Sequence, residues 1–237
     1  MKTSKLNFIK AATILLTIIA ISSCRKETTK TATEDDAADA IETALATSSG
    51  GATQDISAAA QFAMSTGYNQ LQCGVAFDTT VTYSHTGTVT ANYTHAWNVL
   101  LNCNGSTPSS LNWTGSYQGS FDALRLSGNS SGTRNYTFTG LDASSPEYTL
   151  SASSTRTGTH TSKVRNQYTY TVNINTTLTN LSVNKSTYKI TGGSGTVTAT
   201  LSVSNGTSKT FNGNIIFNGN STATLTINGN TYTITVY

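Results

Sequence analysis

The chain has 237 residues, of which 36% are hydrophobic and 11% are charged, and its formal net charge is +3. This length suits a single domain with a leader, or at most two small domains. The net charge is too small to indicate a nucleic-acid partner. Threonine is far more frequent than in ordinary proteins, and its β-branched side chain favours strands. The composition therefore predicts β structure with an uncharged, hydroxyl-rich surface.

The first 24 residues are typical of an export leader. Residues 11–21 form an apolar run behind three lysines, too short for a permanent membrane helix, which needs about 20 apolar residues. The sequence Ile21-Ser22-Ser23-Cys24 resembles the lipobox of bacterial lipoproteins. The resemblance implies that residues 1–23 are a signal peptide and that Cys24 carries lipid, including palmitate, which holds the chain on a membrane. The alternative is an ordinary signal peptide whose cysteine is incidental.

The resemblance also implies a location. The residues after Cys24 are Arg25-Lys26-Glu27. Because Asp is absent there, lipoprotein sorting favours the outer membrane, where the chain faces either the periplasm or the exterior. The Lys-rich leader, the acidic segment 34–46 and the run 213–226 are similar to uncharacterised lipoproteins of Bacteroidota, and residues 78–80 (Asp-Thr-Thr) resemble the short O-glycosylation motif of that phylum.

Two more cysteines, Cys73 and Cys103, remain in the exported part. Export favours their oxidation to a disulfide that closes a loop and stabilises the fold. The alternative is two buried free thiols. No histidines stand at ligand spacing beside them, so we expect neither a zinc site nor any other metal or cofactor.

The region between the leader and the strands predicts a tether with one or two short helices. We assign residues 24–52 to the lipidated cysteine and its tether, and residues 53–237 to one β-rich domain with a short leading helix. Within the tether, Thr33 precedes three acidic residues and could cap a helix, whose apolar face would include Ile41 and Leu45. The alternative is a solvated acidic linker. A second helix is expected over 53–64.

From residue 71 onward the hydrophobic period is two, which predicts strands. The last four strands alternate apolar residues with Thr or Asn and are separated by Asn-Gly turns at 205, 218 and 228, so they form an antiparallel meander. Further strands are expected at 71–78, 86–101, 111–121, 133–140, 146–153, 156–163 and 166–182. The fold is therefore all-β and antiparallel, arranged as a sandwich, a barrel or a wide curved sheet.

The sequence offers no convincing catalytic set. Residues 128–132 (Gly-Asn-Ser-Ser-Gly) match the spacing of a hydrolase nucleophile elbow, but their polar context predicts a hairpin loop. Of the three histidines, His85, His95 and His160, the first two have no nearby acidic residue that would orient a catalytic imidazole, so surface or hydrogen-bonded histidines are expected. Asp122 and Asp142 are the best carboxylate pair for sugar hydrolysis, and only a weak one. We therefore expect a protein that is not an enzyme.

The candidate ligand-binding residues are aromatic and basic. Trp97, Trp113 and Tyr117 fall in one region and could stack against a sugar, although core packing explains them better. Arg125 and Arg134, with the three basic residues Arg156, Lys163 and Arg165, could meet anionic lipid or glycan groups. The alternative is that these are scattered solvated charges that discourage edge pairing.

Three functions follow from these features. The leading hypothesis is a membrane-anchored, non-enzymatic interaction or structural domain of the cell envelope, with a glycan, lipid or protein as its partner. A second is a lipid or hydrophobic-ligand carrier in which the curved sheet encloses an apolar cavity. A third is a carbohydrate-binding or carbohydrate-active protein.

Overall fold

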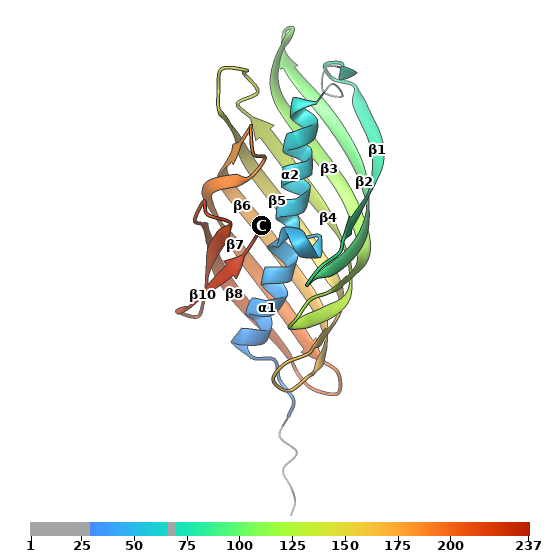
Figure 1. Cartoon of the computed structure of the whole chain (residues 1–237), viewed down its shortest axis with the longest axis vertical. Coiled ribbons are helices and arrows are strands. Elements are labelled where there is room, and N and C mark those ends of the chain that lie inside the picture. Colours follow the sequence, from blue (N-terminus) through green and yellow to red (C-terminus); the bar gives the residue numbers. More distant parts are fainter. Residues whose placement is uncertain (1–28, 66–69) are drawn as a thin grey trace, which may run out of the picture.

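The computed structural model describes residues 29–65 and 70–237, so Cys24 and the leader lie outside the described residues. Ten strands form one antiparallel sheet in which each strand pairs with the next along the chain. The all-β fold is confirmed, and the sheet is open, with β1 and β10 at its two edges (Figure 1). The strands are β1 (Ala76–His85), β2 (Thr90–Asn104), β3 (Thr107–Asp122), β4 (Leu126–Thr139), β5 (Glu147–Ser162), β6 (Thr169–Asn184), β7 (Ile190–Val203), β8 (Ser208–Phe217), β9 (Thr222–Ile227) and β10 (Asn230–Thr235).

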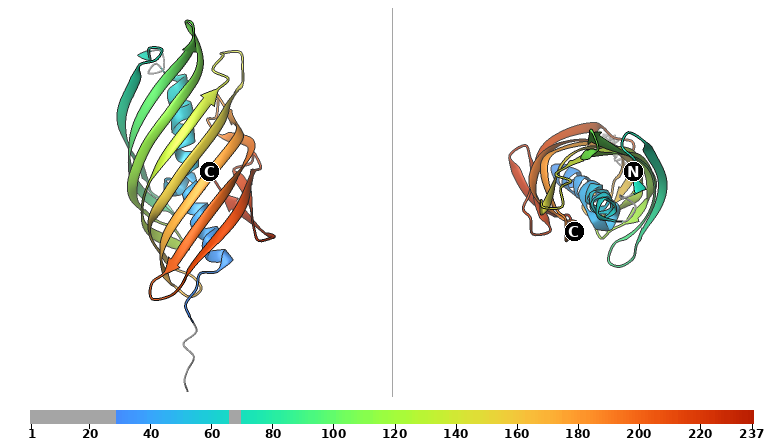
Figure 2. Two further views of the ribbon diagram at one scale, coloured as in Figure 1. Left: turned by 180° about the vertical axis from the view of Figure 1, so that it is seen from behind. Right: turned by 90° about the horizontal axis from the view of Figure 1, so that it is seen from above.

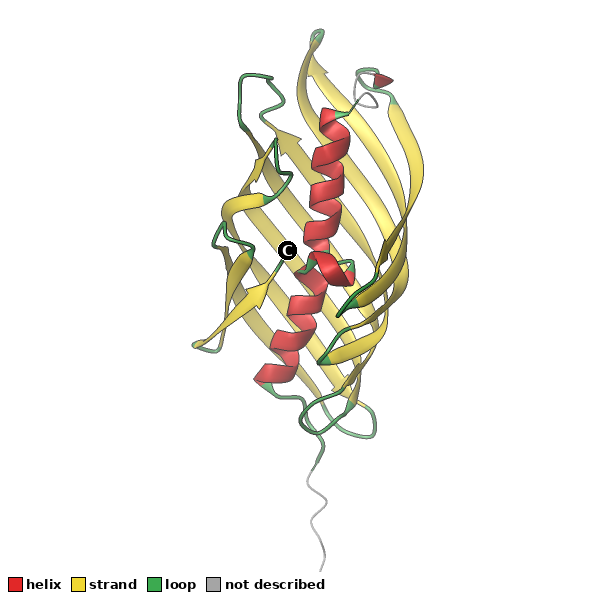
Figure 3. Cartoon of the chain, viewed as in Figure 1, coloured by secondary structure: helices red, strands yellow, loops and turns green. Residues whose placement is uncertain are grey.

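Two helices, α1 (Glu34–Leu45) and α2 (Ala52–Met64), lie inside the curve of the sheet, joined by a short 3₁₀ turn, η1 (Thr47–Ser49). Figure 2 shows them from above, surrounded by strands, and Figure 3 shows them through the opening between the sheet edges. Most of the buried apolar side chains lie between these helices and the concave face of the sheet. The acidic helix expected on the tether therefore belongs to the folded unit.

Helix α1 begins where the sequence predicts. The hydroxyl of Thr33 accepts a hydrogen bond from the backbone N–H of Asp36, and the Asp36 carboxylate accepts one from the backbone N–H of Thr33. This reciprocal cap satisfies two N–H groups that a helix start leaves unpaired. Ile41 and Leu45 are fully buried. Since a helix this short is marginal in water, its packing against the sheet is what maintains it.

The C-terminal end of the chain contacts the helix junction. The carbonyl oxygen of Val236, next to β10, accepts hydrogen bonds from the backbone N–H of Thr47 and from the hydroxyls of Thr47 and Thr53, each at 2.9 Å. Gly50, in the same junction, has φ +65°, and a Cβ there would lie 2.4 Å from the ring of Tyr93. The junction therefore needs glycine for both its backbone conformation and its contact with the sheet.

Large and small residues alternate between strands on the concave face. Tyr93 of β2 pairs with Gly119 of β3, and Trp97 pairs with Gly115. A Cβ on Gly119 would lie 2.5 Å from the Tyr93 ring, so the missing side chains make room for these aromatic rings. Glycines on β3 therefore leave space for the aromatic rings of β2 on this face.

The convex face is polar and uncharged along a complete row of paired residues. The row crosses eight strands from β1 to β8, and its members are Thr82, Thr94, Gln118, Ser131, Thr157, Asn173, Thr200 and Thr210. Neighbouring hydroxyls in such rows bond to each other, as Thr200 does to Thr210 at 2.9 Å. The hydroxyl-rich surface expected from composition is therefore gathered on one face.

The strand predictions agree best at the end of the chain. The four expected strands with Asn-Gly turns are β7 to β10, and their predicted apolar sides are buried. The two strands expected at 146–153 and 156–163 are one long strand, β5, because Arg156 and its neighbours continue the alternation that the sequence seemed to break. The predicted Cys73–Cys103 disulfide is confirmed, with a Cα–Cα distance of 5.6 Å.

Candidate functional site

A cluster of buried polar groups lies where the helix junction faces β2 to β5. Asp55 of α2 forms an ion pair with Arg134 of β4, and its other carboxylate oxygen lies 3.1 Å from Nδ1 of His95. Arg134 also donates to the carbonyl oxygen of Gly50 at 2.9 Å and stacks over the Tyr117 ring, 3.9 Å from its centre. Burial lowers the pKa of Arg134 to about 10 and that of His95 to about 4. At neutral pH the His95 imidazole is therefore neutral, beside the ion pair of Asp55 and Arg134.

Arg156 of β5 is the second buried arginine and holds the end of α1. It donates to the carbonyl oxygen of Thr43 at 3.0 Å, to the Tyr93 hydroxyl at 2.7 Å and to the Ser130 hydroxyl at 3.0 Å. Carbonyl groups in the last turn of a helix have no partner within the helix, and cations are favourable there. Arg156 therefore satisfies the end of α1 from the sheet.

Ser130 belongs to the elbow-like sequence 128–132. The prediction of a hairpin loop there is wrong, because these residues lie within β4. The Ser130 hydroxyl lies 2.9 Å from Nε2 of His160, but both side chains are buried beneath the helices. Burial, with Arg156 nearby, lowers the pKa of His160 to about 3, and its Nδ1 has no hydrogen-bond partner among the described residues. The pair has the serine–histidine contact of a hydrolase but neither the exposed turn nor an orienting acid.

The predicted ligand-binding residues lie in two places. Trp113, Tyr117 and Arg134 are buried within the core, and Trp97 is partly buried with its ring centre 4.8 Å from that of Trp113. Arg125 lies apart, in the β3–β4 turn, with 54% of its side chain exposed. The structure therefore brings four of the five together, inside the fold and under α2.

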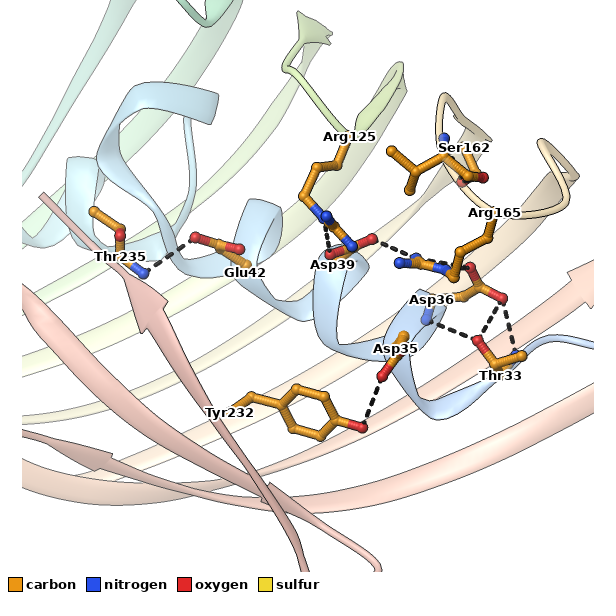
Figure 4. A network of polar contacts seen from close by, with 11 residues as sticks. Thr33, Asp35, Asp36, Asp39, Glu42, Arg125, Ser162, Arg165, Tyr232 and Thr235 are labelled. Carbon is orange, nitrogen blue, oxygen red and sulfur yellow. Dashed lines mark hydrogen bonds and ion pairs between the residues drawn. The ribbon is translucent and has the colours of Figure 1, made fainter.

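The acidic face of α1 is bound to the ends of the sheet, as Figure 4 shows. Arg165, in the β5–β6 turn, pairs with Asp36 and Asp39, and Arg125 bonds to Asp39 at 2.9 Å. Burial opposes ionisation of Asp36, but hydrogen bonds from Thr33 and Arg165 outweigh it and lower the pKa of its carboxyl. These arginines are therefore partners of helix acids rather than a separate basic surface.

Other side chains complete the attachment of α1. The Glu34 carboxylate accepts hydrogen bonds from Asn228 and Asn230, and these bonds lower its pKa. Tyr232 donates its hydroxyl to Asp35 at 3.2 Å. The remaining basic residue of the sequence cluster, Lys163, pairs with Asp122. The contacts explain why most acids lie in the first part of the chain: they meet donors from three distant turns.

Asp122 and Asp142 do not form a site. Asp122 ends β3 and Asp142 follows β4, so the length of β4 separates them. A strand of 14 residues spans about 45 Å, far more than the separation that a glycosidase uses. Among the described residues, no group of three or more His, Cys, Asp or Glu side chains is arranged to bind a metal ion.

Two kinds of hollow open on the surface. On the convex face, three adjoining shallow depressions of about 560, 580 and 690 Å³ share lining residues, including Thr94, Ser131 and Thr133. At the opening of the sheet, a cleft of about 270 Å³ lies between α1 and the β3–β4 turn. Beneath α2, the gap beside Asp55 and the two tryptophans leaves no room for a water molecule.

Comparison with known proteins adds no relative. No protein-family model matches the chain, and neither a curated protein nor a solved structure matches it. Neither of the two helices described here has the length and apolar character that crossing a membrane requires.

Proposed function

We propose that the chain is a lipid-anchored, non-enzymatic protein of the outer membrane that binds an uncharged, hydroxyl-bearing partner, such as a neutral glycan, on the convex face of its sheet. The anchor rests on the lipobox-like sequence that ends at Cys24. The segment before α1 leaves the fold beside the β7–β8 turn, where the backbone N–H of Thr207 donates to the carbonyl oxygen of Lys30 at 2.9 Å. A tether at that end leaves the long convex face accessible.

The uncharged row across eight strands is the observation that carries the binding role. Its middle section, at Thr94, Gln118, Ser131 and Thr157, lines the adjoining depressions. Hydroxyl and amide groups can both donate and accept, which suits a partner rich in hydroxyls. Anionic lipid or nucleic acid would instead require cations, and none stands in this row.

The buried polar groups support a binding role rather than catalysis. A general acid or base must reach the substrate within hydrogen-bond distance. The two imidazoles that lie near polar partners, His95 and His160, are buried under α1 and α2. The contact of His95 with Asp55 joins α2 to the sheet. A substrate would have to displace a helix to reach either imidazole.

Labelling with radioactive palmitate tests the anchor. The wild-type chain expressed in a bacterium should incorporate label and sediment with outer membranes, whereas Cys24→Ala should lose the label and appear in the soluble fraction. Label retained by Cys24→Ala would refute the assignment of Cys24. Protection of the wild-type chain from protease added to intact cells would show that it faces the periplasm.

Sedimentation with insoluble neutral polysaccharides tests the surface. We expect the purified full chain to bind at least one of an α-glucan, a β-glucan and chitin, and Ser131→Lys to abolish that binding. Asn214→Lys is the matched control, because it places the same charge on the convex face of β8, away from the depressions. Equal binding by both variants, or no binding to the panel, would refute the proposed surface.

A further inference from the structure

The cleft of about 270 Å³ at the opening of the sheet has apolar walls. Leu124 and Leu126 line it from the β3–β4 turn and β4, Val89 from the β1–β2 turn, and Ala46 from the end of α1. Leu124 is 71% exposed, the largest exposure among the large apolar side chains described. A cleft lined mainly by apolar side chains is typical of small-molecule sites.

One carboxylate on the wall lacks a cationic partner among the described residues. The Glu42 carboxylate of α1 accepts a hydrogen bond from the backbone N–H of Thr235 at 3.1 Å, and this is the one hydrogen bond of that carboxylate among the described residues (Figure 4). The charge of Arg125 acts on Glu42 from nearby, but this guanidinium donates its hydrogen bond to Asp39. Burial is the main reason why the pKa of Glu42 is raised, and the charge of Asp39 adds to it, although the Thr235 hydrogen bond and the charge of Arg125 act in the opposite direction. An added cation would offset this unfavourable environment.

We propose that this cleft binds a small primary amine whose apolar part is a short alkyl chain or a single ring, with the ammonium group at Glu42 and the apolar part against Leu124 and Leu126. The charge selects an amine over a carboxylate, because Asp39 and Arg125, which also line the cleft, are paired with each other, and this leaves Glu42 as the lining carboxylate that has no ion pair among the described residues. The volume is near the lower end of ligand pockets, which limits the ligand to about one ring. This site is separate from the convex face and does not depend on the glycan proposal.

Ligand-observed NMR on the purified full chain, with benzylammonium, benzyl alcohol and benzoate as probes, tests the site. A ligand of this size should bind with a dissociation constant of about 1 mM. We expect benzylammonium to bind at least about tenfold more tightly than the alcohol, and benzoate not to bind. A factor of ten corresponds to a single favourable ion pair in a partly buried setting.

Two variants separate the charge from the apolar wall. Glu42→Gln keeps an oxygen for the Thr235 N–H and should weaken benzylammonium at least about tenfold while leaving benzyl alcohol unchanged. Leu124→Ser should weaken both probes, and this exposed position should not affect folding. Glu34→Gln is the matched control, since Glu34 lies on the same helix but bonds to Asn228 and Asn230 outside the cleft.

Three outcomes would overturn the site: no binding of benzylammonium at about 10 mM, binding of benzoate as tight as that of the amine, or equal losses with Glu42→Gln and Glu34→Gln. Circular dichroism of each variant would show whether a loss reflects unfolding. If Glu42→Gln is unfolded, the comparison of the three probes on wild-type protein and on Leu124→Ser still decides the question.

Discussion

Arg156 donates a hydrogen bond to the carbonyl oxygen of Thr43 at 3.0 Å, although 113 positions separate the two residues in the chain. The same guanidinium bonds to Tyr93 and Ser130, so one side chain joins α1, β2 and β4 to β5. Arg156→Met should lower the free energy of unfolding by about 3 kcal/mol, because it removes three buried hydrogen bonds from a charged donor. Urea unfolding measures the loss.

Arg125→Met is the control for that experiment. Arg125 also bonds to α1, but its side chain is 54% exposed, and such surface pairs contribute less than about 1 kcal/mol. Equal losses from the two variants would show that Arg156 does not hold the end of α1 as described.

The buried pair of Asp55 and Arg134 predicts a pattern of single and double variants. Asp55→Asn should cost about 3 to 5 kcal/mol, because the guanidinium of Arg134 would be left buried without its counter-ion. The double variant Asp55→Leu with Arg134→Met should cost less than Asp55→Asn, since it removes both charges. A double variant whose loss, measured by urea unfolding, equals the sum of the losses of Asp55→Leu and Arg134→Met made singly would contradict this pairing.

The buried histidines predict loss of stability in mild acid. Burial lowers the pKa of His95 to about 4 and that of His160 to about 3, below their value of 6.5 in an unfolded chain. Between pH 6.5 and these lowered pKa values, the unfolded state therefore binds more protons than the folded state. The stability that the neutral histidines contribute is fully present above about pH 6.5 and declines as the pH falls toward 4. The slope should be about 1.4 kcal/mol per pH unit for each histidine.

Urea unfolding at a series of pH values checks this slope. His160→Gln should remove about half of it, whereas His85→Gln, on edge strand β1, should retain it because both buried histidines remain. A slope that His160→Gln leaves unchanged would show that His160 does not contribute to the acid sensitivity.

The disulfide predicts a moderate dependence on reductant. Cys73 and Cys103 enclose a loop of 30 residues, and closing such a loop stabilises a fold by about 3 to 4 kcal/mol. Replacing both cysteines with serine should lower the free energy of unfolding by that amount while circular dichroism still reports strands. If stability is unchanged on replacement, the unfolded chain must already hold these segments together.

Much of the secondary structure could be predicted from the sequence, because the patterns that indicate strands and helix starts involve residues close together in the chain. Alternation of apolar and Thr residues identified β7 to β10, and Thr33 with its acidic followers identified the start of α1. The single long strand β5 was missed because buried Arg156 stands at an inward position where an apolar residue is expected. A basic residue at an inward position of a strand indicates that polar acceptors lie inside the fold.

The candidate sites could not be predicted from the sequence, because the residues that form each site lie far apart along the chain. His95 has no acid near it in the chain, yet Asp55 approaches it from α2. The cleft combines Glu42 with Leu124 and Val89 from separate turns. The composition predicted an uncharged, hydroxyl-rich surface. That these residues form a continuous row over eight strands could be known only from the register of every strand pair.

The three hydrogen bonds to the carbonyl oxygen of Val236 can form only late in synthesis, because they join the helix junction to a residue made long after it. The ribosome makes α1 and α2 first, and helices this short are marginal in water until packed. The strand segment that fastens their junction is made about 180 residues later. A nascent chain stopped before β10 therefore lacks this fastening of the helix junction, and cotranslational proteolysis should find that junction accessible until residue 236 has been added.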